Sequence, residues 1–141
     1  MRLYLDTNIL VYMRFGNVSD EICVDVLSEL VDYGNTLSVS SVCVHEMIHL
    51  FQIGKIERSK GEGGEASDVI EWLRSKGIEI IAVNERHLSA YSKLPMYDDH
   101  RDPNDRLIIA QAISDRATLI SSDRKFDRYK RYGLQFMFNK R

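Results

Sequence analysis

The chain has 141 residues, of which 44% are hydrophobic and 28% are charged, and its formal net charge is −2. This composition predicts a globular protein with a single domain over residues 1–141, and it excludes an overall basic nucleic-acid-binding protein. No apolar run approaches the ~20 residues of a membrane span and no signal peptide is visible, so we expect a cytoplasmic protein without a membrane partner.

Apolar periodicity and capping residues predict strands and helices in alternation. In the first half of the chain they predict a strand at residues 2–5, a helix capped by Asp6, a helix at 19–31, a strand at 37–39 and a helix capped by Ser40. In the second half they predict a loop at 59–64, a helix at 69–74 that Gly77 ends, a strand at 78–83, a helix capped by Asn84, a helix at 103–112, and strands at 118–121 and 134–138. This alternation is typical of the α/β fold class, in which a central, mostly parallel sheet is flanked by helices.

Four acidic residues follow the predicted strands or lie on the helices after them. Asp6 comes directly after the first strand, and Asp123 follows the strand at 118–121 after one residue. Glu46 lies on the helix after the second strand, and Asp105 lies in the first turn of the helix at 103–112. In an open parallel sheet, ligands bind beyond the carboxyl ends of the strands, so these four side chains can meet in one pocket.

A cluster of carboxylates predicts a site for a hard divalent cation. Buried like charges repel one another, and a bound cation removes that cost. Carboxylate and water oxygens suit Mg²⁺ or Mn²⁺ and not Zn²⁺, and such an ion can polarise a phosphoryl oxygen and activate a water molecule. Each acid also has a structural interpretation by itself, because Asp6, Asp102 and Asp123 could cap helices, Asp105 could complete a capping box, and Glu46 could be a plain surface residue.

Four segments, in order along the chain, resemble the motifs of PIN-domain nucleases, most closely those of the VapC-type toxins of bacterial and archaeal toxin–antitoxin pairs. These segments are Leu5-Asp6-Thr7-Asn8-Ile9-Leu10, Ser40 to Met47, His100 to Ala112, and Thr118 to Asp123. The third segment is the most specific match, although the family commonly has Phe at the position of Asn104. The segment 96–99 before it is longer and more acidic than is usual in the family, which affects the expected substrate and partner but not the metal site.

This resemblance implies a PIN-like fold and metal-dependent hydrolysis of RNA to products with a 5′-phosphate and a 3′-hydroxyl. The residues that it implies as catalytic and as ligands of one or two Mg²⁺ or Mn²⁺ ions are Asp6, Glu46, Asp105 and Asp123. We expect Asp6 and Asp105 to be the principal ligands, and Thr7 and Ser121 to support the site through hydroxyl contacts. VapC-type proteins commonly form homodimers and are neutralised by an antitoxin that lies over the acidic site. The resemblance therefore implies an RNA substrate, a cognate antitoxin protein and a homodimer.

Basic residues near the acids are candidates for contact with RNA phosphates. Arg101 and Arg106 flank the third motif, and we expect them to meet phosphate beside the metal. A second basic run follows the last acid and consists of Arg124, Lys125, Arg128, Lys130 and Arg131. For its outer members a solvated helix face is the simpler interpretation.

One motif indicates a different chemistry. His45-Glu46-Met47-Ile48-His49 has the H-E-x-x-H pattern of zinc peptidases, in which two histidines on one helix face hold Zn²⁺ and the glutamate acts as general base. The extended form with a Gly and a third His does not follow, and this interpretation leaves Asp6, Asp105 and Asp123 unexplained. A further alternative is a PIN-like module that binds RNA or protein without cutting, since fold does not imply function. The presence of all four acids argues against that alternative.

Overall fold

The computed structural model describes residues 1–16, 18–54 and 66–140, and the loop predicted at residues 59–64 lies outside these ranges. The described residues form a five-stranded sheet in the order β3–β2–β1–β4–β5, in which every neighbouring pair of strands is parallel. The strands are β1 (Arg2–Leu5), β2 (Thr36–Ser40), β3 (Glu79–Ile81), β4 (Thr118–Ser121) and β5 (Gln135–Phe138). The expected α/β fold with a parallel sheet is confirmed.

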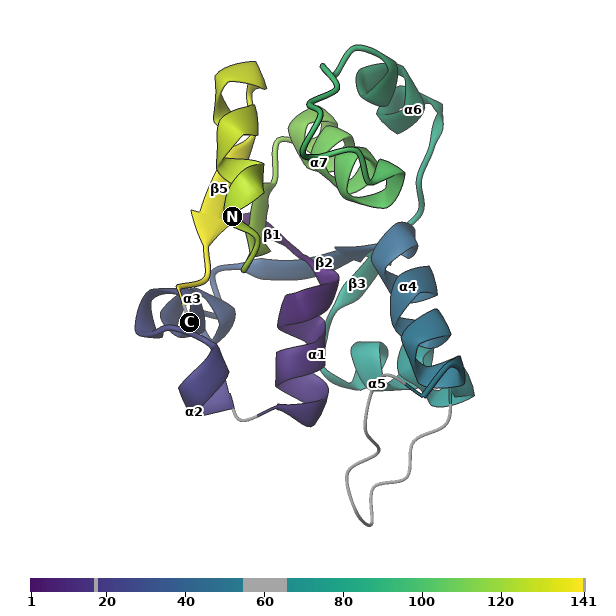
Figure 1. The fold of residues 1–141 in the computed structure, drawn as a ribbon. Helices are drawn as coiled ribbons and strands as arrows, with labels where there is room; N and C mark the ends of the chain where they lie inside the picture. Colours follow the sequence, from purple (N-terminus) through teal and green to yellow (C-terminus); the bar gives the residue numbers. More distant parts are fainter. Residues whose placement is uncertain (17, 55–65, 141) are drawn as a thin grey trace.

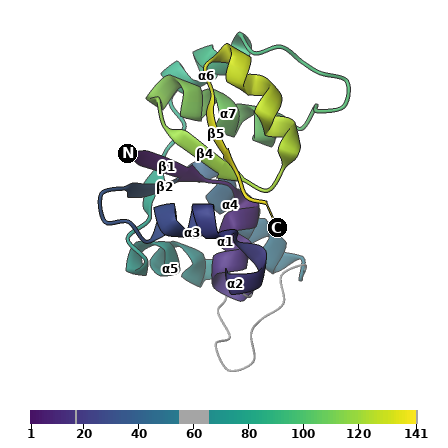
Figure 2. The ribbon, with the colours of Figure 1, turned by 90° about the vertical axis from the view of Figure 1, so that its left-hand side faces the viewer.

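Helices cover both faces of the sheet (Figure 1; Figure 2). One face carries α1 (Thr7–Phe15), α2 (Val18–Glu21), α3 (Val24–Leu30), α4 (Ser41–Gln52) and α5 (Val69–Ser75), which follows the short 3₁₀ helix η1 (Ala66–Asp68). The other face carries α6 (Glu85–Ser92), α7 (Pro103–Asp115) and the 3₁₀ helix η2 (Arg124–Tyr132). The chain runs from β1 outward to β2 and β3 and later returns to the other side of β1 at β4. The strand order therefore reverses between β1 and β4, which is where open α/β sheets bind their ligands.

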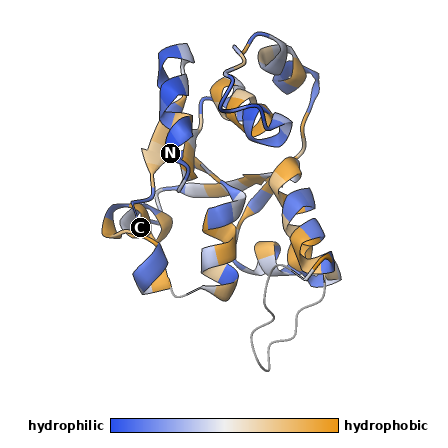
Figure 3. Cartoon of the chain, viewed as in Figure 1, coloured by the Kyte–Doolittle hydropathy of each residue, from blue (hydrophilic) through white to orange (hydrophobic). Residues whose placement is uncertain are grey.

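The central strands are apolar because helices cover both of their faces. Leu3, Leu5, Leu119 and Ile120 are at most 1% exposed. In Figure 3, α4 and α7 alternate between hydrophobic and hydrophilic residues, as expected for helices with one face on a sheet, whereas η2 is mainly hydrophilic. None of the helices in the described part of the chain is both long enough and apolar enough to cross a membrane.

The single helix predicted at residues 19–31 is wrong, because the structure divides this stretch into α2 and α3. Between them Ile22 is buried, and Cys23 takes an extended conformation as the N-cap of α3. The fully buried side chain of Asn139, just after β5, forms hydrogen bonds with the backbone on both sides of the break between α2 and α3. It accepts from the backbone amide of Cys23 and donates to the backbone carbonyl of Glu21, each at 2.8 Å. A residue from the far end of the chain thus satisfies backbone groups that a continuous helix would have paired internally.

Other elements differ from the prediction only at their ends. The strand predicted at 78–83 is limited to Glu79–Ile81, the helix predicted at 103–112 continues to Asp115, and the last strand begins at Gln135. The predicted N-caps are confirmed for Asp6, Ser40, Asn84 and Asp102, whose side chains accept hydrogen bonds from backbone amides of the helices that they precede. These caps fix where the chain leaves one element for the next, and so place the residues of the candidate site.

Candidate active site

The four predicted acids lie together beyond the carboxyl ends of the strands. Asp6 follows β1 directly, Asp123 follows β4 after one residue, Glu46 lies on α4, and Asp105 lies in the first turn of α7. All four line one pocket of about 410 Å³. The other residues that line it are Thr7, Asn8, Val11, Tyr12, Leu50 and Asp102. The fold therefore brings together acidic side chains from four separate segments of the chain.

Asp6 is the most buried of the four acids, with 7% of its surface exposed. One carboxylate oxygen accepts hydrogen bonds from the hydroxyl of Ser121 at 2.7 Å and from the side-chain amide of Asn8 at 3.2 Å. The other oxygen accepts from the backbone amide of Thr7 at 2.8 Å. Burial raises the pKa of Asp6 to about 6, the Ser121 bond opposes this rise, and repulsion from Asp105 adds to it. Asp6 is thus held in one orientation at a place where negative charge is costly.

Asp105 and Glu46 are partly buried and lie within reach of other negative charges. Burial raises the pKa of Asp105 to about 7, with further repulsion from Asp102 and Asp123. Burial also raises the pKa of Glu46, with added repulsion from Asp6. The acids of the pocket therefore disfavour one another's ionised forms in the absence of a cation.

Both hydroxyl residues predicted to support the site are buried beside the acids. The Ser121 oxygen accepts from the backbone amide of Asp123 at 3.0 Å, while its proton is donated to Asp6. Ser121 therefore links the acid after β1 to the acid after β4. Thr7 is 4% exposed, and its buried hydroxyl oxygen has no hydrogen-bond partner among the described residues.

Asn8 also belongs to the site, although the sequence assigned it no role. Its side-chain amide donates to Asp6 and to the Ser121 hydroxyl, each at 3.2 Å, and its side-chain oxygen accepts from the backbone amide of Ser122 at 3.2 Å. Asn8 thus ties the start of α1 to the end of β4. Its position two residues after Asp6 in the first motif was the signal that could have revealed it.

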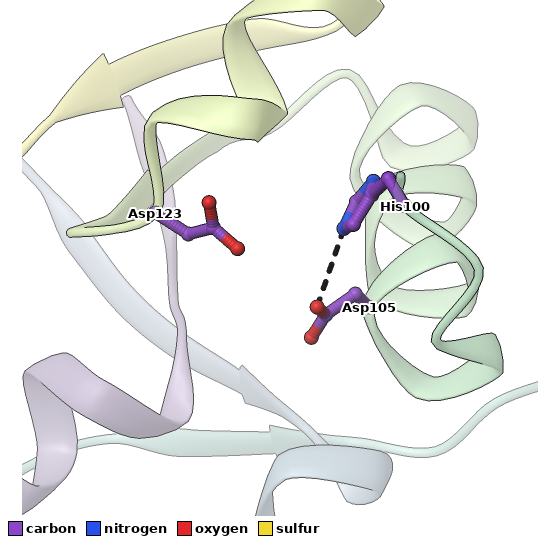
Figure 4. A group of neighbouring side chains, drawn as sticks. All are labelled: His100, Asp105 and Asp123. Atoms are coloured by element: carbon purple, nitrogen blue, oxygen red, sulfur yellow. Dashed lines mark hydrogen bonds and ion pairs between the residues drawn. The ribbon is translucent and has the colours of Figure 1, made fainter. Parts of the chain in front are cut away.

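His100 is the second site residue that the sequence did not predict. It lies two residues before Asp102, the N-cap of α7, and is 4% exposed. Its Nδ1 lies 2.9 Å from the Tyr129 hydroxyl, and its Nε2 lies 3.3 Å from a carboxylate oxygen of Asp105. Figure 4 shows the imidazole and the carboxylates of Asp105 and Asp123 around a common space. One potential ligand atom from each of these three residues lies within 4.8 Å of the other two.

The two arginines beside the third motif have different surroundings from those expected. Arg106 is 4% exposed, and its guanidinium donates to the Tyr91 hydroxyl at 3.0 Å and to the Leu94 carbonyl at 3.2 Å. These bonds attach the segment before α7 to that helix, so the expected contact of Arg106 with phosphate is corrected to a structural role. Arg101 is exposed, and its guanidinium lies 3.8 Å from the carboxylate of Asp98.

The basic run after Asp123 forms η2, and part of it is bound to the acidic segment before His100. Arg128 forms an ion pair with Asp99, and the Lys125 ammonium donates to the Asp99 backbone carbonyl at 3.0 Å. Arg124, directly after Asp123, is exposed. Arg128 and Lys125 are already bound to Asp99, and Arg101 is paired with Asp98, so Arg124 is the better candidate for attracting a phosphate chain.

The two histidines of the H-E-x-x-H pattern do not join the pocket. His45 and His49 are exposed, whereas Glu46 lines the acidic pocket. Over the described ranges, the group of side chains close enough to share a metal ion is His100, Asp105 and Asp123; it contains neither of these histidines, and Asp6 and Glu46 also lie outside it. The zinc-peptidase interpretation is therefore not supported.

The donor set of the pocket fits a hard divalent cation. Asp115, at the end of α7, offers a comparison, because burial acts on it too but hydrogen bonds from Tyr4 and His87 hold its pKa below the usual value. At Asp105 burial and the neighbouring acids raise the pKa instead. A divalent ion would supply the missing positive charge, and carboxylate oxygens are the ligands that Mg²⁺ and Mn²⁺ accept.

The sequence matches the model of the PIN domain family over residues 3–132. A match over this share of the chain shows that the protein belongs to the PIN domain family, in agreement with its parallel sheet and acidic pocket. No curated protein sequence matches the chain.

The solved structures with a similar fold include three VapBC assemblies. The chain is 26% identical to one in VapBC2 from Rickettsia felis bound to a DNA fragment from its promoter, with a TM-score of 0.69 over 99% of this chain and 100% of that one. It is 23% identical to a chain of VapBC-1 from nontypeable Haemophilus influenzae, with a TM-score of 0.66 and 98% of both chains covered. It is 16% identical to a chain of DNA-bound VapBC from Salmonella typhimurium, with a TM-score of 0.67 and 98% of both chains covered. The last two likenesses show a shared fold.

Proposed function

We propose that this protein is an endoribonuclease that uses Mg²⁺ or Mn²⁺ to hydrolyse RNA phosphodiester bonds. The observation that carries the proposal is the meeting of Asp6, Glu46, Asp105 and Asp123 in one pocket at the point where the strand order reverses. Membership of the PIN domain family supports the same activity, because homologues of this family are nucleases.

In this mechanism Asp6 and Asp105 would be the principal ligands of the cation, and Glu46 and Asp123 would complete the set or orient the attacking water. A bound Mg²⁺ or Mn²⁺ would polarise a non-bridging phosphate oxygen and lower the pKa of water. The Ser121 hydroxyl keeps Asp6 in its orientation. Water loses a proton and adds to phosphorus, the bond from phosphorus to the 3′ oxygen breaks, and that oxygen takes up a proton, so the products carry a 5′-phosphate and a 3′-hydroxyl.

The test is cleavage of a labelled pool of structured RNA by the purified protein with Mg²⁺, Mn²⁺, Zn²⁺ or EDTA. Asp6→Asn is the decisive variant, and Asp127→Asn is the matched control because Asp127 lies exposed on η2, paired with Lys130 at 2.8 Å. We expect cleavage with Mg²⁺ or Mn²⁺ that is lost in EDTA and in Asp6→Asn and kept in Asp127→Asn and His49→Ala. Full cleavage by Asp6→Asn would contradict the assignment of the acidic pocket as the active site. Absence of cleavage with every metal would favour a module that binds without cutting.

We further propose that the protein is the toxin of a toxin–antitoxin pair, that it forms a homodimer, and that an antitoxin covers its acidic pocket. The likeness to a chain of Rickettsia felis VapBC2 over nearly the full length of both chains supports this proposal. The test is expression of the chain alone and together with the product of a short neighbouring reading frame. Growth arrest by the chain alone, absent in Asp6→Asn and relieved by co-expression, is the expected result. Normal growth with active nuclease would indicate a nuclease outside toxin–antitoxin systems.

A further inference from the structure

The imidazole of His100 is fixed from one side and presents its other nitrogen to the acids. Its ring packs among aromatic rings, with centroid distances of 5.5 Å to both Phe126 and Tyr129. Nδ1 lies 2.9 Å from the Tyr129 hydroxyl, so that Nε2 points toward Asp105. A histidine that binds a metal usually donates its other ring N–H to a fixed partner, which sets both the tautomer and the direction of the ring. The Tyr129 oxygen is placed to be that partner.

The three potential ligand atoms of His100, Asp105 and Asp123 have a spacing close to that of a metal shell. The atoms lie within 4.8 Å of one another. Ligands on opposite sides of an ion with bonds of 2.0–2.1 Å lie about 4 Å apart, so small side-chain rotations would bring all three to bonding distance. His100 lies in the segment before α7, Asp105 lies in the first turn of α7, and Asp123 follows β4 after one residue as the N-cap of η2. Residues from two parts of the chain that are distant in sequence therefore meet at this spacing.

We propose that His100 is a nitrogen ligand to the divalent cation held by Asp105 and Asp123, and that it makes the site prefer Mn²⁺ over Mg²⁺. This inference rests on the divalent-metal site of the proposed function. Imidazole nitrogen is a softer ligand than carboxylate oxygen, and it suits first-row transition ions better than Mg²⁺, which binds through oxygen and keeps its own water molecules. A nitrogen ligand among carboxylates should therefore strengthen the binding of Mn²⁺ but not that of Mg²⁺.

The first measurement is pulsed electron paramagnetic resonance of the purified full-length protein loaded with Mn²⁺ alone. A directly bound imidazole nitrogen couples to the Mn²⁺ spin, so we expect that coupling in the wild-type protein and its loss in His100→Gln. His45→Gln is the matched control, because His45 is exposed next to Glu46 and is the other histidine adjacent to a pocket acid. Coupling that is absent from the wild type, or lost in His45→Gln and kept in His100→Gln, would overturn the inference. If His100→Gln fails to fold, absence of coupling from the wild type or its loss in His45→Gln would still overturn the inference, and coupling kept in His45→Gln would still support it.

The second measurement compares the Mn²⁺ and Mg²⁺ affinities of the same proteins by calorimetric titration. We expect His100→Gln to weaken Mn²⁺ binding by about tenfold or more and to change Mg²⁺ binding by less than about twofold. Equal losses for both ions would mean that His100 only positions Asp105, and would overturn its assignment as a ligand. Tyr129→Phe should weaken Mn²⁺ binding less than His100→Gln, because it removes the support of the ligand and not the ligand.

The two proposals can fail separately in these experiments. Nitrogen coupling in a protein that cleaves no RNA would support His100 as a ligand and contradict the ribonuclease proposal. Cleavage of RNA by a protein without nitrogen coupling would support the ribonuclease proposal and contradict His100 as a metal ligand.

Discussion

The Ser121 hydroxyl donates a hydrogen bond of 2.7 Å to the Asp6 carboxylate, across 115 positions of sequence. The same oxygen accepts from the backbone amide of Asp123 at 3.0 Å. One side chain on β4 therefore sets the orientation of an acid after β1 and the path of the backbone at another acid. Because β1 and β4 are neighbours in the sheet, with Leu5 paired to Ile120, this link is a direct consequence of the strand order.

Ser121→Ala should weaken divalent-metal binding by about tenfold, since partners that orient metal ligands typically contribute 10–100-fold to affinity. The hydroxyl also lowers the pKa of Asp6, so its loss favours the protonated form that cannot bind a cation. Calorimetric titration with Mg²⁺ at pH 7 measures the change. Ser92→Ala is the control, because it removes an exposed hydroxyl at the end of α6 and should leave the affinity unchanged. Equal affinities of Ser121→Ala and wild type would show that Asp6 does not depend on this bond.

The metal-free protein should carry a destabilising contribution that grows as the pH rises from about 4 to about 7. The pKa values of Asp6 and Asp105, about 6 and about 7, are raised above the usual 3.8. The folded state therefore binds protons more tightly than the unfolded state, and raising the pH through this window favours unfolding. The lowered pKa of His100 acts in the opposite direction, so the deciding comparison is between wild type and Asp105→Asn. Thermal melts in EDTA should show the variant gaining stability relative to wild type as the pH rises, and Mg²⁺ should reduce that difference.

Arg101 and Arg106 should respond differently to substitution. Arg101→Gln removes an exposed charge, so RNA affinity should fall and the slope of log affinity against log salt should decrease by about 1, with little change in stability. Arg106→Lys replaces a guanidinium that bonds Tyr91 and Leu94 by a group that cannot make the same fork, so it should lower the melting temperature. If Arg106→Lys kept wild-type stability and decreased the slope of log affinity against log salt, the result would support the phosphate contact of Arg106 that the sequence predicted.

Asn139→Ala should lower the free energy of unfolding by about 2 kcal/mol, because buried backbone groups lose their hydrogen-bond partners. The groups affected are the amide of Cys23 and the carbonyl of Glu21 at the break between α2 and α3. Urea unfolding measures the loss. Asn104→Ala, at an exposed position on α7, should change stability by no more than about 0.5 kcal/mol. Similar values for the two variants would mean that the break does not need Asn139.

Local patterns predicted most of the fold because each strand and helix carries its own signal. The apolar runs at β1 and β4 and the caps at Asp6 and Ser40 depend on residues close in sequence, so they could be interpreted without the tertiary structure. The break at Ile22 could not be predicted, because the apolar spacing continues through it and its stabilising partner is Asn139.

In the candidate site, too, the residues that depend on local sequence could be predicted and those that depend on tertiary packing could not. Asp6 and Asp123 follow strands, Asp105 lies in the first turn of α7 and Glu46 lies further along α4, and the parallel arrangement of the strands brings these elements to one edge of the sheet. The direction of a side chain within that edge depends on packing. His100 turns to the acids because Phe126 and Tyr129 from η2 hold its ring, and Arg106 turns away because Tyr91 and Leu94 bind it. Neither pair of contacts leaves a trace in the spacing of the sequence.

The position of β1 at the centre of the sheet has a consequence for the timing of synthesis. Of the five strands of this sheet, β1 is synthesised first and its neighbour β4 is synthesised fourth. Until β4 has emerged, one edge of β1 has no partner strand, and Asp6 lacks both the Ser121 hydroxyl and Asp123. A nascent or prematurely ended chain that stops before residue 118 carries three of the four acids but cannot assemble the pocket. The acidic pocket can therefore form only after synthesis has passed Asp123.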